Sequence, residues 1–505
     1  MPDAAGQLTT DHLPTTAEKQ AVARDDDTGK KRPRAVLLNP PGTRRYFRDY
    51  FCSLTSKAHY YYHPIDLVYL SGVLDRAGFL IECMDAIAEG WSPQETHDRI
   101  VRFQPQLVIY LISSPSYDED AAFLSKLRDS LPAATFVGSG DIYRELRERA
   151  LSLHPFCDAV LTDFSTGDLI SWLQRTDDRV FENVIYRGKE GQAVIGPEHH
   201  LHGHYHLPVP RWDLWPLHRY RFPFSTSKRW ATVLTDFGCP YSCTFCPMST
   251  TGYKLRDLDT VMDELRLLRA LGVREVFFRD QTFGVNRART GVFLKRLRQE
   301  CPGLRWICWS RVDIVTETFL QQIRAAGCHT IMYGIESSNE EILRTYKKRT
   351  SRSQIERALA LSRAVGLKTV GTVIIGLPGD TEASIRATID YVCLLPIDFV
   401  SFNIATPRFG SRFRETMLSQ HALEATTLRL DSSHMIPLWQ EQDEILVLPR
   451  QKIQALHSLA VRRFYLRPTY VFRRLLSLRS LHQLRNQLLE GWYLFSTLRR
   501  KDEQE

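Results

Sequence analysis

The sequence lacks any apolar run long enough to cross a bilayer. A membrane-spanning helix needs about 20 consecutive apolar residues, and no stretch of the 505 residues has that character. The opening residues, MPDAAGQLTTDHLPTTAEKQ, also lack the basic start and apolar core of a secretory signal. Both absences argue against an exported or membrane-spanning protein, and we expect a cytoplasmic location.

Cysteine is too sparse for a disulfide-stabilised scaffold, and charge of one sign is not strongly in excess. Ten cysteines in 505 residues do not resemble the short, cysteine-dense chains of secreted domains. A reducing compartment would leave their thiolates free to bind metal. The net charge of +8 is mild, so it fits acidic ligands or a membrane surface without indicating nucleic acid.

Hydrophobic residues make up 43% of the chain, which is enough for full cores in roughly three domains. Residues 1–33 are polar and charged, and we predict a disordered tail there. Strand-like apolar runs then alternate with helical patterns, which predicts a doubly wound, Rossmann-like parallel sheet over 34–175. The predicted strands are 34–39, 79–85, 107–113, 134–139 and 158–163. We interpret 176–229 as a linker that contains a hairpin around Gly191.

A second alternating series covers residues 230–410. Its predicted strands are 230–237, 275–280, 304–310, 329–336, 368–376 and 398–406. Six strand–helix units are too few for a closed eight-fold barrel, so we predict an open, partial (β/α)6 barrel. In barrels of this kind the chemistry lies at the carboxyl ends of the strands. Residues 411–505 break the alternation and predict a helical, Arg-rich and aromatic-rich C-terminal domain.

Three cysteines follow the first strand of this second series. Cys239, Cys243 and Cys246 have the spacing C-x3-C-x2-C within FGCPYSCTFCPMST. Four ordinary interpretations remain open. The loop could form a zinc site, although no histidine is near to complete one. It could also hold a disulfide, contain inert thiols, or take a distant fourth cysteine ligand such as Cys301 or Cys308.

A 4Fe–4S cluster with three thiolate ligands is the sharper interpretation. Such clusters normally take four cysteines, so three leave one iron with an open coordination position. The open position would be the place where a substrate or cofactor binds.

With the aromatic Phe245 directly before its last cysteine, the motif resembles the signature of the radical SAM enzymes. The resemblance implies that the open iron binds the amino and carboxylate groups of S-adenosylmethionine (SAM). One electron would then cleave SAM to a 5′-deoxyadenosyl radical. An external one-electron reductant of flavodoxin or ferredoxin type is implied as well.

Other segments are similar to further motifs of that family. By resemblance, MYGIESSNEEIL would place Gly334, Glu336 and Ser337 beside SAM, and GTVIIGLPGDT would place Gly376 at the adenine. The alternative for Glu336 is that it caps the next helix. The family likewise implies Asp280 and Gln281 at the edge of the site and Arg311 near the SAM carboxylate, with a surface salt bridge as the alternative for Arg311.

The N-terminal series, placed before such a barrel, resembles a cobalamin-binding domain. Ligands of open α/β sheets bind at the carboxyl ends of strands, and the resemblance implies that small residues there contact the corrin. These residues are Ser113, Ser114, Gly138, Ser139 and Gly140. The D-x-H-x-x-G motif that supplies a cobalt ligand in some cobalamin proteins is absent, and the nearest histidines are His59 and His63. A vestigial domain without cobalamin is the alternative.

Three further features have weaker meanings. Cys308 and Cys328 are candidate donors of a proton or hydrogen atom, with core packing as the alternative. EHHLHGHYH (198–206) could bind metal or form a surface loop. The Arg-rich C-terminus could cap the barrel or lie on a membrane, whereas its interleaved Leu and Phe do not suit nucleic acid.

Together the resemblances imply a cobalamin-dependent radical SAM C-methyltransferase. Its substrate would be a small molecule such as a natural-product intermediate, a tetrapyrrole or a lipid. The family chemistry implies that one SAM methylates cob(I)alamin and a second gives the radical that abstracts hydrogen from an unactivated carbon. Radical cyclisation, rearrangement or oxidation with the same cofactors is one alternative, and a non-catalytic metal-cluster module is another.

Overall fold

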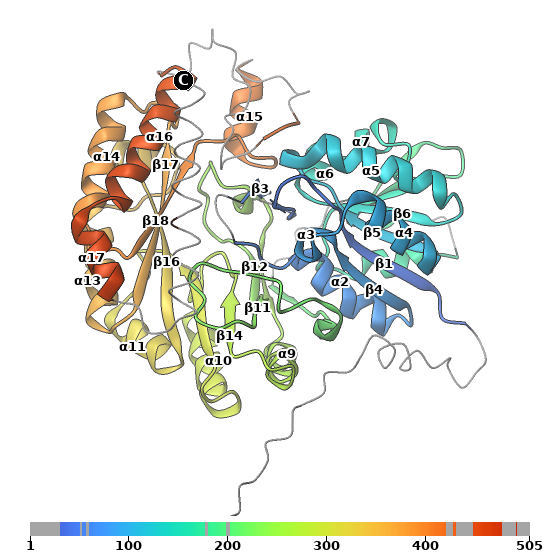
Figure 1. Ribbon diagram of the computed structural model, residues 1–505, viewed down its shortest axis with the longest axis horizontal. Helices are drawn as coiled ribbons and strands as arrows, with labels where there is room; N and C mark the ends of the chain where they lie inside the picture. The colour runs from blue at the N-terminus through green and yellow to red at the C-terminus, as the bar shows by residue number, and fades with distance from the viewer. Residues whose placement is uncertain are drawn as a thin grey trace, which may run out of the picture.

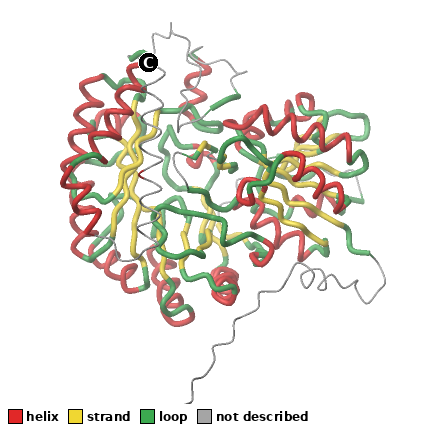
Figure 2. The backbone as a smooth tube through the Cα atoms, in the orientation of Figure 1, coloured by secondary structure: helices red, strands yellow, loops and turns green. Residues whose placement is uncertain are grey.

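A computed structural model describes residues 31–50, 53–56, 60–176, 180–197, 203–420, 428–430, 448–476 and 491. Most of the predicted disordered tail, His59, the start of the histidine-rich stretch and most of the chain after 476 lie outside these residues. The described part forms two lobes, each built on a sheet (Figure 1). Figure 2 shows the strands at the centre of each lobe and the helices around them.

The first lobe contains a seven-stranded sheet in the order β4-β1-β5-β6-β7-β8-β9. Its five parallel strands are β1 (Arg34–Asn39), β4 (Leu80–Asp85), β5 (Leu107–Leu111), β6 (Thr135–Ser139) and β7 (Ala159–Leu161). Numbered along the chain, the parallel part has the order 2-1-3-4-5, that of a doubly wound fold. The prediction of a parallel α/β sheet is confirmed here.

Helices cover both faces of this sheet, and their starts follow local sequence signals. They are α2 (Ile65–Arg76), α3 (Ala86–Glu89), α4 (Pro93–Phe103), α5 (Tyr117–Ser130), α6 (Asp141–Leu146), α7 (Arg149–Leu153) and α8 (Asp168–Leu173). Helix α4, for example, begins where Ser92 caps the amide of Glu95 and Pro93 takes the first turn. Helix α2 is different because residues 65–74 are all buried, so it is enclosed on every side.

The predicted hairpin belongs to the first sheet and not to a linker. Strands β8 (Val184–Arg187) and β9 (Ala193–Ile195) are antiparallel, and β8 pairs with β7. The sheet therefore continues past the predicted boundary at 175. Pairing with β7 satisfies the backbone groups of an edge that would otherwise be open.

The second lobe contains a six-stranded parallel sheet whose strands follow one another in chain order. They are β11 (Trp230–Val233), β14 (Glu275–Phe278), β15 (Arg305–Ser310), β16 (Cys328–Glu336), β17 (Lys368–Ile375) and β18 (Phe399–Ile404). The intervening helices are α9 (Leu258–Ala270), α10 (Arg287–Glu300), α11 (Glu317–Ala325), α12 (Glu340–Thr345), α13 (Arg352–Ala364) and α14 (Glu382–Leu394). In Figure 1 these helices lie along the outer side of the sheet.

Two smaller parts complete the second lobe. A three-stranded sheet joins β10 (Gly203–Tyr205), β13 (Tyr253–Arg256) and β12 (Asp236–Gly238). Among the described residues, helices α15 (Arg412–Ser419), α16 (Arg450–Tyr465) and α17 (Pro468–Leu476) follow β18. Helix α16 packs against β18, where the Tyr465 hydroxyl donates to the Val400 carbonyl at 2.7 Å.

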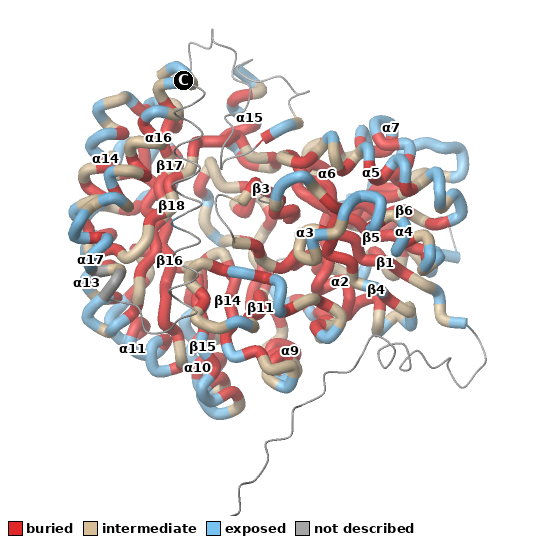
Figure 3. Tube along the Cα trace, in the orientation of Figure 1, coloured by how far each residue is buried: buried red, intermediate tan, exposed pale blue. Residues whose placement is uncertain are grey.

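The two lobes share one hydrophobic core. Buried residues of α2 and the first sheet belong to the same cluster as the outer face of the second sheet, and Figure 3 shows buried segments running from one lobe into the other. The Tyr69 hydroxyl of α2 accepts a hydrogen bond from the Leu234 amide at 2.8 Å. Within the described residues, no helix is both long and apolar enough to cross a bilayer.

Candidate active site

The three cysteines lie in one loop at the carboxyl end of β11. The chain leaves β11 at Val233, passes through β12 and enters the cysteine loop, residues 239–246. A short 3-10 helix, η3 (Pro247–Thr250), follows it and leads into β13. Because β12 and β13 pair antiparallel, they close the loop at its base and hold it over the end of the sheet.

The entry to the loop depends on Gly238. Its φ of 84° is in the left-handed region that glycine adopts readily. A Cβ atom at this position would lie 1.9 Å from the Gly252 carbonyl oxygen. The Cys239 amide donates to the same carbonyl at 3.1 Å. The close approach of these two backbone segments therefore fixes the position of Cys239.

Segments far apart in the sequence hold the rest of the loop. The Thr244 amide donates to the Tyr346 carbonyl at 3.0 Å, and the Phe413 amide donates to the Thr244 carbonyl at 2.9 Å. The loop thus contacts the chain after α12 and the start of α15. Phe245, the aromatic residue of the motif, lies beside the Tyr346 ring, with centroids 6.3 Å apart.

The three thiols have different neighbours. Cys239 Sγ lies 3.8 Å from Thr282 Oγ1, and Cys243 Sγ lies 3.9 Å from the Lys347 carbonyl oxygen. Burial raises the pKa of Cys239, and it raises the pKa of Cys246 to about 12, where the charges of the other two cysteines add to the shift. Thiols in such surroundings hold their protons until a metal displaces them.

The structure gives evidence on the ordinary interpretations of the motif, namely a zinc site, a disulfide, inert thiols or a distant fourth cysteine ligand. All nine cysteines in the described ranges are free thiols. No three His, Cys, Asp or Glu side chains among these residues converge on one point that could hold a single ion, whereas cysteines of a cluster bind separate irons. Cys301 ends α10 next to Arg269, and Cys308 lies against Cys328.

Arg311 connects the loop to the strand ends. Its Nη1 lies 3.5 Å from Cys243 Sγ, and its Nη2 donates to the Lys348 carbonyl at 2.8 Å. The guanidinium also binds Asp313 through two nitrogens and stacks 4.0 Å from the Tyr241 ring. Burial works against the charge, but Asp313 raises the pKa of Arg311. Arg311 is therefore a buried cation beside a cysteine and not a surface salt bridge.

Glu336 ends β16 with a strained backbone. Its φ is 64°, which is rare for a side chain of this kind, and the pairing of β16 with β17 shifts register at this point. Its carboxylate accepts from Lys348 Nζ at 3.2 Å and from Thr372 Oγ1 at 3.3 Å. A Cβ on Gly334 would lie 2.2 Å from the Glu336 carboxylate. Glu336 is not a helix cap, because Asn339 caps α12.

Asp280 contacts the segment just before the cysteine loop, and its carboxylate is bound by the protein. Its carboxylate accepts from the Thr235 amide at 2.7 Å, from Thr235 Oγ1 at 2.5 Å and from the Asp236 amide at 3.1 Å. These contacts join the end of β14 to the turn between β11 and β12. Asp280 thus supports the cysteine loop from below through the backbone. Burial and the Asp280 charge raise the pKa of Asp236 well above its usual value.

The remaining residues of the SAM prediction lie on the same edge of the sheet. Ser337 accepts from the Asn339 amide at 3.0 Å, so its hydroxyl shapes the turn into α12. Gly376 has a φ of 82° and lies against Ile453 of α16. Cys308 and Cys328 are fully buried in the core between the sheet and its outer helices, so the structure does not bring them to the cysteine loop.

The residues predicted to contact cobalamin lie where β5 and β6 end, but most are engaged within the protein. Ser113 Oγ pairs with Ser116 Oγ at 2.7 Å, and Ser114 Oγ donates to Asp141 at 2.9 Å. A Cβ on Gly138 would meet the Tyr143 ring, and one on Gly140 would meet the Ile112 carbonyl, both at 2.1 Å. These glycines are thus required by internal packing. Ser139 alone keeps a buried hydroxyl with no hydrogen-bond partner among the described residues.

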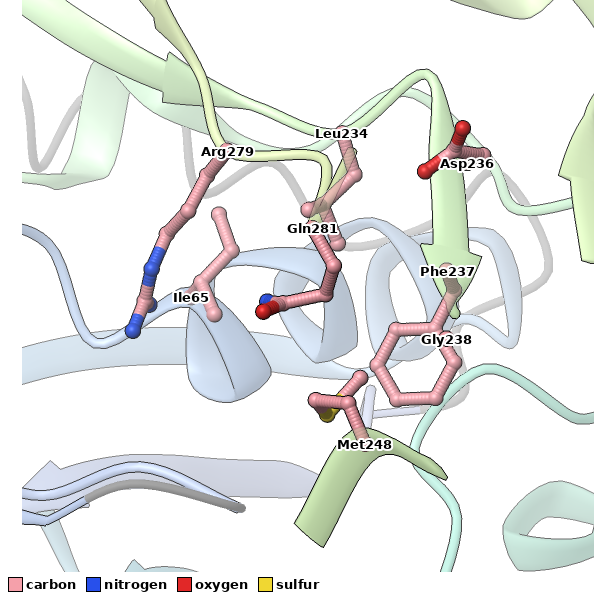
Figure 4. A pocket seen from close by; sticks show the side chains of 8 residues that line it. All are labelled: Ile65, Leu234, Asp236, Phe237, Gly238, Met248, Arg279 and Gln281. Carbon is pink, nitrogen blue, oxygen red and sulfur yellow. The ribbon is translucent and has the colours of Figure 1, made fainter. Parts of the chain in front are cut away.

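A cavity lies between the lobes just before Cys239 (Figure 4). Figure 4 shows the Gln281 amide between Ile65 of α2 and the ring of Phe237, with Met248 beside that ring. The full lining is Ile65, Leu234, Asp236, Phe237, Gly238, Met248, Arg279 and Gln281. Both lobes and the residues that flank the cysteine loop, Gly238 and Met248, therefore border the same space.

Several contributors were missed by the sequence reasoning. Thr282, Lys348 and Thr372 contact Cys239 or Glu336. Lys348 follows α12 within YKKRT, a segment that reads as an exposed basic run. Its position in the sequence could have predicted this role, because Lys348 follows the strand that carries Glu336.

Comparison with known proteins agrees with this geometry. Residues 234–392 match the radical SAM superfamily model. An uncharacterized methyltransferase of Pyrococcus horikoshii is 28% identical over 71% of this chain and 79% of its own length. Cytidylyl-2-hydroxyethylphosphonate methyltransferase of Streptomyces wedmorensis is 24% identical over 77% of this chain and 82% of its own.

A solved structure shares the fold of both lobes. The radical SAM methyltransferase TsrM of Kitasatospora setae, with cobalamin and a [4Fe–4S] cluster bound, aligns with a TM-score of 0.61 at 20% identity. The alignment covers 77% of this chain and 78% of TsrM. The chain therefore contains a segment, residues 234–392, that matches the radical SAM superfamily; it is similar in sequence to methyltransferases and shares its fold with a radical SAM methyltransferase solved with cobalamin bound.

Proposed function

We propose that this chain is a cobalamin-dependent radical SAM enzyme that methylates an unactivated carbon of a small molecule. One observation carries the proposal: the three-cysteine loop lies at the junction of a six-stranded consecutive sheet and a second parallel sheet. Arg144, in the helix that follows β6, donates to Thr250 Oγ1 in η3 at 3.3 Å. The carboxyl edge of the first sheet is thus in contact with the segment that follows the last cysteine.

The donor set fits a three-thiolate cluster. Cys239, Cys243 and Cys246 supply sulfur, and Arg311 places a fixed positive charge beside Cys243. A nearby cation favours the thiolate that the metal needs. In this proposal the six-stranded sheet is the partial barrel of the radical SAM fold, and its β15 and β16 ends carry the groups around the cluster.

Glu336 and Lys348 suit the amino-acid end of SAM. A carboxylate and an ammonium 3.2 Å apart offer an acceptor for the SAM amine and a donor for its carboxylate. We infer that the strained backbone of Glu336 holds this carboxylate in place before SAM binds, which reduces the entropy lost on binding. Thr372 would keep Glu336 oriented.

The fit to cobalamin rests on fewer residues. Support comes from the fold shared with TsrM, from the carboxyl edge of the first sheet at the lobe junction, and from the unpartnered Ser139 hydroxyl. The buried pair of Arg48 and Asp120, with Nη2 and Oδ1 2.6 Å apart, closes the base of this edge. Ser139 and the loops after β1 and β5 would hold the corrin there.

With these groups bound, the cluster and SAM supply the radical and the corrin supplies the methyl group. The protein orients the participants and excludes water. The apolar side chains Ile65, Leu234, Phe237 and Met248 beside the cysteine loop suit the exclusion of water. TsrM has been solved with tryptophan, and a small molecule is the substrate class we propose here.

The products of SAM distinguish methyl transfer from other radical outcomes. Anaerobically reduced protein with SAM and candidate substrates should release both S-adenosylhomocysteine and 5′-deoxyadenosine, and the product should gain one methyl mass. 5′-Deoxyadenosine with an unmethylated product would instead support cyclisation, rearrangement or oxidation. No cleavage of SAM in the reduced, iron-loaded protein would contradict an enzymatic function and favour a binding module.

A further inference from the structure

Exposed apolar side chains gather at one corner of the second lobe. In the described ranges, eight large hydrophobic side chains are exposed, and four of them share this corner. They are Leu394, 85% exposed, Leu466, 57%, Val471, 43%, and Phe472, 67%. The other four, Leu153, Val180, Ile195 and Val292, are scattered over separate elements. Single exposed apolar residues are ordinary, whereas a group of them marks an interaction surface.

These four residues lie on three neighbouring elements, at the ends of α14 and α16 and in the middle of α17. Leu394 ends α14, Leu466 follows α16, and Val471 and Phe472 lie in α17. Arg467 fastens this junction, because its guanidinium donates to the Phe464 carbonyl at 2.9 Å and to the Cys393 carbonyl. We call the group Leu394, Leu466, Val471 and Phe472 the C-terminal corner. In α17 the residues Pro468, Thr469, Val471 and Phe472 are exposed, and Figure 3 places this helix at the edge of the lobe.

Basic side chains predominate beside this corner, and one of them, Arg463, forms an ion pair with Asp390 of α14. Arg462, Arg463, Arg467 and Arg474 all lie in or between α16 and α17. Over residues 450–501 the sequence has twelve Lys and Arg and one acidic residue, Glu490, a net charge of +11. Since the whole chain carries +8, the rest of the chain carries −3. The positive charge of this protein is therefore concentrated in the part that contains the corner.

We propose that the C-terminal corner docks on a membrane surface rich in anionic phospholipid. Phe, Leu and Val side chains can enter the boundary between head groups and acyl chains, while guanidinium groups remain at the level of the phosphates. Each basic residue near an anionic surface adds to the attraction. Neither the apolar group nor the charge alone would select such a surface, but together they do.

An acidic reductant protein is a less suitable occupant. Arg474 lies 4.0 Å from the ring of Phe399, the first residue of β18. The corner is therefore at the amino ends of the strands, and the cysteine loop is at the carboxyl ends. Electron transfer to a cluster in that loop requires close approach at the other end of the sheet. Lipid docking at the corner would leave the cysteine loop accessible.

The test uses the full chain and vesicles of defined composition. We expect it to sediment with vesicles of equal phosphatidylglycerol and phosphatidylcholine, and at least tenfold less with phosphatidylcholine alone or in 0.5 M NaCl. The double variant Leu466→Glu/Phe472→Glu should lose at least tenfold in binding. The matched control Leu153→Glu/Val292→Glu introduces the same charges at exposed apolar positions elsewhere and should bind nearly as the unmodified chain does.

Circular dichroism and iron content monitor folding of both variants, and Leu394→Glu alone provides a milder test at the most exposed position. Absence of binding to anionic vesicles would overturn the proposal. Equal losses in the two double variants, or none in either, would also overturn it, because binding would then not depend on the corner. Concentration-dependent self-association that only the corner variant abolishes, without vesicle binding, would instead identify a second copy as the occupant.

Discussion

Glu336 has a backbone conformation that a glutamate rarely adopts. A side chain held at positive φ costs of the order of 1–3 kcal/mol and persists only where its surroundings enforce it. Here Lys348 and Thr372 bind the carboxylate, and Gly334 leaves room for it. Strain of this kind is typical of binding sites, and it supports the role proposed for Glu336 toward the SAM amine.

Replacement of Glu336 by Gln tests that role. The amide keeps the shape but removes the charge-assisted hydrogen bond, which is worth about 1.5–3 kcal/mol. We expect SAM affinity to fall roughly 10- to 100-fold by equilibrium dialysis under anaerobic conditions, with iron content unchanged. The control Glu341→Gln alters an exposed carboxylate in the first turn of α12. Unchanged SAM binding in Glu336→Gln would remove Glu336 from the site.

Gly238→Ala tests the entry to the cysteine loop. A Cβ there would meet the Gly252 carbonyl at 1.9 Å, and the φ of 84° would be strained as well. We expect less than half of the iron of the unmodified protein and a lower melting temperature. Gly291→Ala in α10 is the matched control, since nothing lies near its added methyl group, and it should be neutral or stabilising by up to about 1 kcal/mol. Full iron loading in Gly238→Ala would show that the loop tolerates another path.

At the residue scale, the sequence identifies groups that are close together along the chain. Cys239, Cys243 and Cys246 are recognisable because their spacing is local. Lys348 and Thr282 are not, because Lys348 reaches Glu336 from the segment after α12 and Thr282 reaches Cys239 from the segment after β14. Gly138 and Gly140 were predicted to contact cobalamin. In the structure, the Tyr143 ring and the Ile112 carbonyl of the same lobe lie where a Cβ atom on these residues would be.

At the scale of elements, Asp280 links two strand ends to the cysteine loop. Its carboxylate accepts hydrogen bonds from the Thr235 amide, the Thr235 hydroxyl and the Asp236 amide. Both amides bond to Oδ1 and the Thr235 hydroxyl bonds to Oδ2, so Asp280→Asn should keep the amide contacts but remove the acceptor of the buried Thr235 hydroxyl, at about 1–3 kcal/mol.

We expect Asp280→Asn to lower the melting temperature by several degrees and to reduce iron retention during chelator treatment. Asp263→Asn, on the exposed surface of α9 beside Arg266, is the control and should change neither. If Asp280→Asn retained its iron and melted normally but lost SAM affinity, the carboxylate would act on the ligand and not on the loop.

The strands were predictable because buried parallel strands are nearly continuous apolar runs. RAVLLN forms β1 as expected, and the runs that give β14 to β18 lie within one or two residues of their predicted bounds. The hairpin of β8 and β9 was assigned to a linker because its pairing partner, β7, lies about 20 residues earlier. Local sequence carries turn signals but not the identity of a distant edge.

At the scale of the whole molecule, a buried carboxylate joins the first lobe to the segment between the lobes. Asp85 ends β4 and accepts from Tyr61 at 3.0 Å and from Tyr220 at 2.9 Å. Burial raises the pKa of Asp85 to about 6. The pKa of Asp in an unfolded chain is about 4. Between about pH 4 and pH 6, Asp85 therefore holds a proton in the native state that it has lost in the unfolded chain.

Stability from Asp85 should therefore be fully present below about pH 4 and be lost as pH rises to about 6, by about 3 kcal/mol in total. Asp85→Asn removes this dependence. We expect the melting temperature of the unmodified protein, relative to Asp85→Asn, to fall between pH 4.5 and 7 and to stay constant above. Asp98→Asn, at a half-exposed position of α4, should follow the unmodified protein. A difference that grew with pH would contradict the protonated native state.

The central claim is that two sheets meet around a three-thiolate cluster and a corrin. Its most direct test is the iron, sulfide and corrin content of anaerobically purified protein, beside a Cys239→Ala/Cys243→Ala/Cys246→Ala variant. We expect about four irons and one corrin per chain, with iron lost and corrin retained in the variant. Iron without corrin would contradict the cobalamin-dependent function and leave a radical SAM enzyme whose first lobe has another role.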